Sequence, residues 1–303
     1  ERQPGPGAVA ALGLHRDLTA GDADRPQRAA LRLGELSIEG WSRAGEETWF
    51  RVHPPGLAFD CGRGALELSG ARDLFVSHGH LDHALGVPWV LSQRTLHHRE
   101  PTRVVCPREV AADLGELIEA AARLERVRYG YEILPVGPGD RVEVGRDLAV
   151  VPFATEHVVP SLGFHLLRRR HHLRAELRGL DGTRLAALRR AGTPIEDESE
   201  EVWLSYCGDT AAGVFERAPR LVESRVLMIE CTFLGGPMRR RGSEYGHLHV
   251  EDLAERADQL AGCQAILLHH LSRRHTVAEL RGEVERLMPD LAPRVHLLFE
   301  GAR

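Results

Sequence analysis

The sequence lacks lysine altogether, so its 39 basic residues are all arginines. Chemistry that needs a lysine amine, such as Schiff-base formation or the phosphate-binding lysine of a P-loop, is therefore excluded. The chain also has no apolar stretch near the ~20 residues that a membrane helix needs, and no charged start before an apolar core that would mark a signal peptide. We therefore expect neither a membrane protein nor a secreted one.

Cysteine is scarce, whereas histidine is abundant. The five cysteines are widely spaced and form no C-x-x-C pair, which predicts reduced thiols in a cytoplasmic protein. The net charge of −5 is mild, so any surface that binds nucleic acid must be local. The 17 histidines call for an explanation, because imidazole is the commonest metal ligand and a frequent proton carrier.

The order of apolar segments predicts one α/β domain over residues 31–303. Residues 1–30 are rich in Gly, Pro, Ala and Arg and have no apolar periodicity, which is typical of a flexible leader. Short apolar runs then alternate with amphipathic segments. Strands are predicted at 56–59, 74–76, 103–106, 148–154, 162–167, 202–206, 226–229, 265–268 and 295–299, and helices at 87–98, 109–125, 183–191, 250–260 and 277–287.

An arginine-rich insertion interrupts this alternation at about 168–200. It reads RRRHH at 168–172, and an acidic run follows at 196–201. One interpretation is a solvated segment whose charges compensate each other; the other is an arm that grips phosphates. In the second case the candidate RNA-contacting residues are Arg168, Arg169, Arg170 and Arg174.

The strongest chemical signal is the string His78-Gly-His80-Leu-Asp82-His83 after the predicted strand 74–76. Three imidazoles and one carboxylate at a strand end are a ligand set that suits zinc. His157, Asp209 and His270 each follow another predicted strand, so strands packed side by side would gather them at one edge. Five histidines and two aspartates fit two metal ions with one bridging carboxylate.

These residues belong to a longer series of motifs. The series is Phe59-Asp60-Cys61-Gly62, the His78–His83 string, His157-Val-Val-Pro-Ser-Leu-Gly163, Gly208-Asp209-Thr210, Glu230-Cys-Thr232-Phe233, Gly246-His247 and His270-Leu-Ser272-Arg-Arg274. It resembles the metallo-β-lactamase superfamily and, within it, the compact form of the tRNase Z-like group. The resemblance implies an α/β fold, the four-layer αβ/βα sandwich with two mixed β-sheets.

The resemblance also implies a ligand set for two zinc ions per chain, with manganese as an alternative. His78, His80 and His157 would hold one ion, Asp82, His83 and His270 the other, and Asp209 would bridge them. Two such cations lower the pKa of a shared water toward ~7, which creates the nucleophilic hydroxide. Three residues are the expected catalytic groups: Asp82, His247 as general acid, and Glu230 orienting His247. Asp60 and Thr232 are expected to support the ligands.

The function that this implies is an endoribonuclease that trims the 3′ ends of precursor tRNA, acting as a homodimer. An alternative keeps the metal chemistry but acts on a small phosphodiester, sulfate ester or lactone. The segment after Gly163 favours that alternative, because it lacks the long Gly/Pro-rich extension with which many relatives grip tRNA. A third possibility is a non-catalytic RNA-binding scaffold. We disfavour it because such proteins are expected to lose metal ligands, whereas this sequence keeps all seven candidates.

Overall fold

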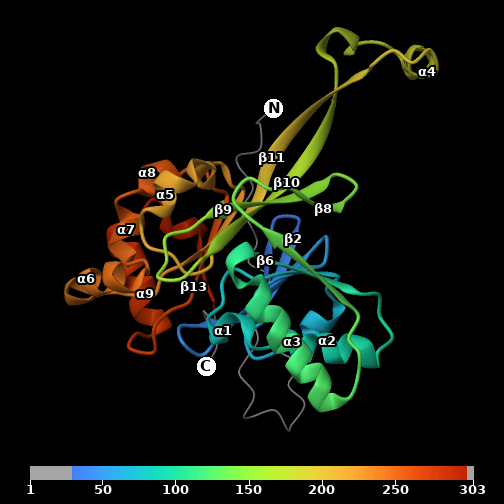
Figure 1. Ribbon diagram of the computed structural model, residues 1–303. Helices are drawn as coiled ribbons and strands as arrows, with labels where there is room; N and C mark the ends of the chain where they lie inside the picture. The colour runs from blue at the N-terminus through green and yellow to red at the C-terminus, as the bar shows by residue number, and fades with distance from the viewer. Residues whose placement is uncertain (1–28, 299–303) are drawn as a thin grey trace, which may run out of the picture.

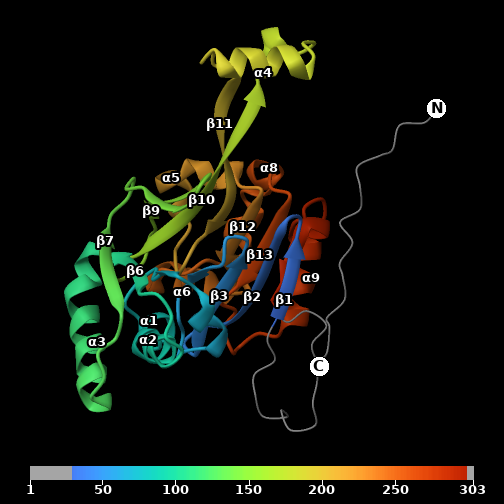
Figure 2. The ribbon, with the colours of Figure 1, turned by 90° about the vertical axis from the view of Figure 1, so that its right-hand side faces the viewer.

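The computed structural model describes residues 29–298, which form two facing β-sheets with helices on their outer sides (Figures 1 and 2). The predicted leader, 1–30, lies outside the described residues except for Ala29 and Ala30, which begin the first strand. In the described part of the chain, no helix is long and apolar enough to cross a membrane.

The first sheet is antiparallel over its first four strands and parallel from β4 to β7. Its strands, in order of pairing, are β1 (Ala29–Leu33), β2 (Leu36–Arg43), β3 (Glu47–His53), β4 (Leu57–Phe59), β5 (Asp73–Phe75), β6 (Thr102–Pro107) and β7 (Tyr131–Val136).

The second sheet is antiparallel from β8 to β11 and parallel from β11 to β14. Its strands pair in reverse chain order: β14 (Val295–Leu297), β13 (Ala265–His269), β12 (Val226–Glu230), β11 (Glu196–Tyr206), β10 (Leu162–Leu173), β9 (Leu148–Ala154) and β8 (Val142–Gly145). Both sheets are therefore mixed.

The facing sides of the two sheets form the central core. Phe59 of β4 stacks on Tyr206 of β11 at 4.8 Å between ring centroids, and on Phe164 of β10 at 5.9 Å. All three rings are fully buried. Aromatic rings pack well in such offset arrangements and bury a large apolar area. The core thus joins the two halves just beneath the strand ends that carry the motifs.

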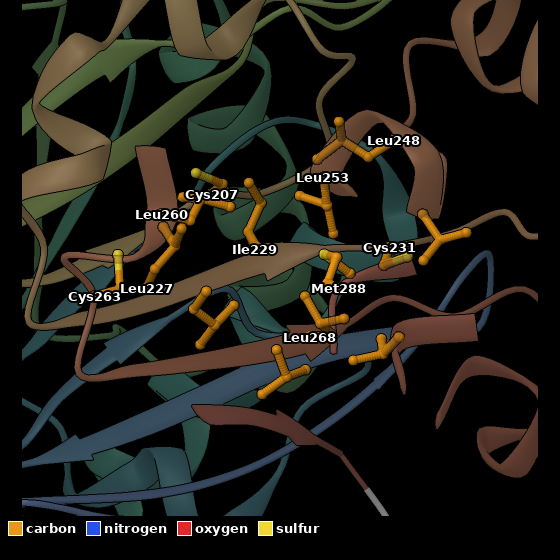
Figure 3. Close-up of a cluster of buried hydrophobic side chains, with 14 of the residues drawn as sticks. Cys207, Leu227, Ile229, Cys231, Leu248, Leu253, Leu260, Cys263, Leu268 and Met288 are labelled. Atoms are coloured by element: carbon orange, nitrogen blue, oxygen red, sulfur yellow. The ribbon is translucent and has the colours of Figure 1, made fainter. Parts of the chain in front are cut away.

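Helices cover the outer face of each sheet. The covering helices are α1 (Leu81–Ala84), α2 (Val87–Leu96) and α3 (Ala111–Glu125) on the first sheet, and α5 (Val214–Arg217), α7 (Val250–Ala254), α8 (Ala257–Leu260) and α9 (Val277–Leu287) on the second. Figure 3 shows the apolar layer beneath the second group, where Leu253 and Leu260 meet Leu227, Ile229 and Leu268. The result is the four-layer αβ/βα sandwich expected from the motifs. Short 3-10 helices lie at Leu66–Gly70, Arg108–Val110, Ala175–Leu177, Pro219–Glu223 and Ala292–Arg294.

The arginine-rich insertion forms an arm. Strands β10 and β11 continue together well past the sheet, from the pair Phe164–Tyr206 to the pair Leu173–Glu196. Helix α4 (Gly182–Arg190) lies at the tip, far from the body of the molecule (Figures 1 and 2). The predicted strands 162–167 and 202–206 are therefore too short, because opposite charges on the two strands face each other and extend the pairing.

Other local predictions need correction as well. The predicted helix 250–260 is two helices, α7 and α8, because Arg256 leaves helical geometry and its guanidinium reaches the Asp252 carbonyl and Glu216. Strands β1, β2, β3, β7 and β8 were not predicted, and neither was α6 (Gly236–Tyr245), whose sequence lacks an apolar stripe. The last predicted strand, 295–299, ends at Leu297, and residue 299 lies outside the described residues.

Candidate metal centre and active site

The predicted ligands gather at one edge of the two sheets. Each follows the end of a strand, and parallel strands end at the same edge of a sheet. His78 to His83 follow β5 and enter α1, His157 follows β9, Asp209 follows β11 and His270 follows β13. The structure brings all seven residues together in two groups that could each hold a metal ion, His78–His80–His157–Asp209 and Asp82–His83–His270.

In the first group, ring nitrogens face one another around a common point. His80 Nδ1 lies 3.1 Å from His78 Nε2 and 3.3 Å from His157 Nε2. Asp209 Oδ2 lies 3.7 Å from His78 Nε2 and 3.9 Å from His157 Nε2. Burial lowers the pKa of His78 well below its ordinary value, which favours the neutral imidazole that binds metals.

The second group faces the other oxygen of Asp209. His83 Nε2 and His270 Nε2 lie 3.4 Å apart, and Asp209 Oδ1 is 3.3 Å and 3.2 Å from them. Asp82 Oδ2 is 3.7 Å from each of the same two nitrogens. Burial alone would raise the pKa of Asp209, but His270 and His83 hold it well below its ordinary value. One oxygen of this carboxylate thus faces each group.

The arrangement fits two cations on a further ground. Asp209 Oδ1 is buried and has no hydrogen-bond partner among the described residues. An unsatisfied buried oxygen is costly unless an ion or another group meets it. Five imidazoles and two carboxylates form a donor set typical of zinc.

In His78, His83, His157 and His270, the ring nitrogen that points away from the two groups is held by the protein. His78 Nδ1 meets Ser77 Oγ at 2.9 Å, His157 Nδ1 donates to the Gly246 carbonyl at 2.9 Å, and His270 Nδ1 meets Thr232 Oγ1 at 3.0 Å. Such contacts fix the tautomer and the ring orientation of a metal-binding histidine.

Asp60 holds the fourth of these rings. This fully buried carboxylate accepts hydrogen bonds from His83 Nδ1 at 2.8 Å, from the Ser77 backbone N–H at 2.7 Å and from Ser77 Oγ at 2.8 Å. It also accepts one from the Tyr206 hydroxyl at 2.5 Å. Tyr206 was not predicted as a site residue, because it reads as an ordinary apolar strand residue.

His247 and Glu230 form a pair beside Asp209. His247 Nδ1 donates to Glu230 Oε1 at 2.8 Å, and Glu230 also accepts from Thr210 N–H, Leu248 N–H and, at 2.5 Å, Thr232 Oγ1. Burial works against a charge on His247, yet Glu230 raises its pKa to about 9. The side chain keeps 17% of its surface exposed, so its other nitrogen can reach a bound molecule.

The arginines of the arm are engaged with carboxylates. Arg168 pairs with Glu35 and Glu201 and stacks over Trp203, at 4.0 Å from the ring centroid. Arg170 also pairs with Glu201, Arg169 with Glu198, and Arg174 with Glu176 and Asp197. These contacts favour the interpretation in which the charges compensate each other.

Comparison with known proteins agrees with this geometry. Residues 59–270 match the family described as the beta-lactamase superfamily domain. The metallo-β-lactamase fold protein YhfI from Bacillus subtilis superimposes with a TM-score of 0.59 at 15% identity, over 86% of this chain and 95% of that one. The chain therefore belongs to the metallo-β-lactamase superfamily and is a metal-dependent hydrolase.

Whole-chain relatives narrow the assignment. Two proteins of Arabidopsis thaliana, tRNase Z TRZ1 and the chloroplastic tRNase Z TRZ2, are each 30% identical to this chain over 91% of its length. The matched region spans 99% of TRZ1 and 78% of TRZ2. The short form of human tRNase Z superimposes with a TM-score of 0.51 at 16% identity, over 86% of this chain and 88% of that one. Within the superfamily, the chain belongs to the tRNase Z family.

Proposed function

We propose that this protein is a zinc-dependent endoribonuclease that removes 3′ trailers from precursor tRNA. The whole-length similarity to proteins named tRNase Z supports this substrate. The observation that carries the chemistry is the His247–Glu230 pair beside a cluster of seven potential ligands. A phosphodiester with a ribose leaving group needs both a centre for cations and a proton donor.

We assign the two groups of ligands to two zinc ions, as the donor set allows. His78, His80 and His157 would hold one ion, and Asp82, His83 and His270 the other, with Asp209 between them. When bound, zinc supplies an activated water at neutral pH and neutralises charge on the phosphoryl oxygens. Manganese suits fewer of these ligands, because imidazole is a borderline ligand that prefers zinc.

The side chains around the cluster have separate tasks. Asp82 has an oxygen that accepts from the Gly45 backbone N–H at 3.0 Å, and the same carboxylate would hold the proton of the attacking water. Glu230 accepts a hydrogen bond from the Nδ1–H of His247, so the opposite nitrogen of the ring carries the proton for the leaving O3′. Thr232 donates to Glu230 and contacts His270, so it couples this pair to the second group of ligands.

Hydrolysis of a small ester is the second candidate, and one observation favours it. The arm places carboxylates against Arg168, Arg169 and Arg170, which leaves little net positive charge there to bind RNA phosphates. RNA contact by these residues and by Arg174 stays a prediction. A non-catalytic scaffold is disfavoured, because no ligand of the cluster is missing.

The test uses a precursor tRNA with a 3′ trailer and a chromogenic aryl phosphodiester, side by side. We expect zinc-loaded protein to cleave the RNA at the trailer junction, a chelator to abolish cleavage, and added zinc to restore it. Asp82→Ala should lose cleavage, whereas Asp113→Ala, on the exposed surface of α3, serves as the matched control. Intact RNA together with hydrolysis of the aryl ester would refute the RNA substrate and favour the second candidate.

We further propose a cytoplasmic homodimer. The apolar side chains of Leu81, Leu85 and Trp89 recur every four residues beside the site and are 64%, 43% and 39% exposed. A stripe of this kind is typical of a surface that another protein covers. Leu85→Glu should give a monomer in sedimentation analysis, and a monomeric unsubstituted protein would contradict the proposal.

The five buried, unpaired cysteines agree with a reducing compartment, as expected for a cytoplasmic protein.

A further inference from the structure

Helix α6 (Gly236–Tyr245) carries a basic, aromatic surface that neither the metal cluster nor the core uses. Among its side chains are Arg239, Arg240, Arg241, Glu244 and Tyr245, so three arginines against one glutamate leave a net charge of +2. Only Gly242 of this helix is buried. Figure 1 shows α6 at the outer margin of the molecule, beyond α7 and α9.

The helix is firmly joined to the active site at its C-terminal end. Its C-cap is Gly246, in the left-handed region at φ 70°, and a Cβ there would lie 2.9 Å from His157 Nδ1. The Gly246 carbonyl accepts the hydrogen bond from that same nitrogen. His247, the candidate proton donor, is the next residue, and its N–H donates to the Gly242 carbonyl at 2.8 Å. The orientation of α6 and the position of His247 are therefore set together.

The arginines of α6 are not equivalent. Arg239 anchors the helix, because it pairs with Glu251 and Asp252 of α7 and with Glu255, the residue that follows α7. Arg240 is 89% exposed, and among residues 29–298 its ion pair is with Glu244, one turn further along the same helix.

Arg241 differs from both. In the described part of the chain it has no carboxylate partner, and its guanidinium lies over the Tyr245 ring at 5.3 Å from the centroid. Tyr245 itself is 52% exposed. An outward guanidinium without a carboxylate partner in the described chain, next to an exposed ring, is a pair of groups that can bind a phosphate and a base of a single strand.

The chemistry decides which side of the cut this surface faces. In phosphoryl transfer, the attacking and leaving oxygens lie roughly in line on opposite sides of the phosphorus. His247 protonates the leaving O3′, so it lies on the side of the nucleotide that keeps the new 3′-OH. Because α6 leads directly into His247, it lies on that side too, whereas the trailer keeps the phosphate and stays bonded to the phosphorus through its O5′.

We propose that α6 binds the nucleotides on the 5′ side of the scissile bond, at the unpaired 3′ end of the tRNA body. Tyr245 stacks on a base there, and Arg241 contacts a flanking phosphate. The inference rests on the proposed function, because the direction of the strand follows from the role of His247.

The experiment measures cleavage of precursor tRNA with a short and a long trailer, and binding of mature tRNA to the zinc-loaded protein by fluorescence anisotropy. Tyr245→Ala and Arg241→Gln are compared with Arg123→Gln, an exposed arginine of α3. We expect both α6 variants to raise KM about tenfold for both trailers and to weaken mature-tRNA binding by a similar factor, with much less effect on kcat. The Arg123 variant should match the unsubstituted protein.

Two results would overturn the inference. One is an effect that grows with trailer length, which would place α6 on the 3′ side of the cut. The other is mature-tRNA binding that is no weaker in the α6 variants than in Arg123→Gln. If the unsubstituted protein leaves both precursors uncut, the proposed function fails. The comparison of mature-tRNA binding then tests by itself whether the α6 surface binds the tRNA body. Circular dichroism of each variant shows whether it has folded.

Discussion

Replacing Asp60 by asparagine tests whether this buried carboxylate holds His83 in place for the metal. The carboxylate accepts four hydrogen bonds, three of them at Oδ2, from Ser77 Oγ, His83 Nδ1 and the Tyr206 hydroxyl. An amide of the same shape keeps one oxygen. The best orientation leaves that oxygen with those three donors and turns the NH₂ group against the Ser77 backbone N–H, which now lies 2.7 Å from Oδ1.

The magnitude follows from this conflict. One buried donor loses its acceptor and a second, the new NH₂ group, finds none, and each costs about 1–3 kcal/mol. We expect Asp60→Asn to lower the free energy of unfolding of the metal-free protein by about 2–6 kcal/mol. Because the ring of His83 is then held less firmly, zinc affinity should fall by about 10–100-fold.

The assays are urea unfolding in the presence of a chelator and zinc titration against a chromophoric competitor. Asp73→Asn is the matched control, because Asp73 is a buried carboxylate whose partner is Arg103, away from the ligands. It should lose stability but keep the zinc affinity of the unsubstituted protein. If Asp60→Asn also keeps that affinity, the reasoning about His83 is wrong and Asp60 serves the fold alone.

Three other predictions concern the proton donor, a buried histidine and the arm. His247→Ala should lower kcat for precursor RNA by about 10²–10⁴, with a far smaller loss for a nitrophenyl diester, whose leaving group needs no proton; equal losses would contradict the role of His247. The Nδ1 atom of His165 is hydrogen-bonded to Ser205 Oγ at 2.7 Å. Burial lowers the pKa of His165 to about 3, so the folded protein keeps this ring neutral. The contribution of His165 to the free energy of unfolding should therefore be fully present above the unfolded pKa of about 6.5 and should fall as the pH drops below it, by about 2 kcal/mol at pH 5. In urea unfolding, His165→Gln should lack this part of the decline, and an unaltered decline would refute the prediction. Arg170→Ala should leave the salt dependence of RNA binding unchanged, since Arg170 is already paired with Glu201; a slope smaller by about one would mean a direct phosphate contact.

The sequence alone indicated the chemistry and much of the architecture. The spacing of His78, His80, Asp82 and His83 places four potential ligands in one short segment, whatever the remainder of the chain does. His157, Asp209 and His270 could be added because each follows an apolar run, and the ends of neighbouring strands meet at one edge. Short buried strands of three to five residues could also be predicted, because a continuous apolar run is a strong local signal.

Only the tertiary structure decided how these groups face one another. Which oxygen of Asp209 serves which group depends on the packing of β11 between β10 and β12, and no local pattern encodes it. Tyr206 reaches Asp60 across the two sheets, over a separation of 146 residues. Composition could not tell whether the arm's arginines are free, because the answer lies in the cross-strand register of β10 and β11, which sets carboxylates opposite guanidiniums. Pairing between distant segments is a property of the folded chain, because it depends on which surfaces the core brings together.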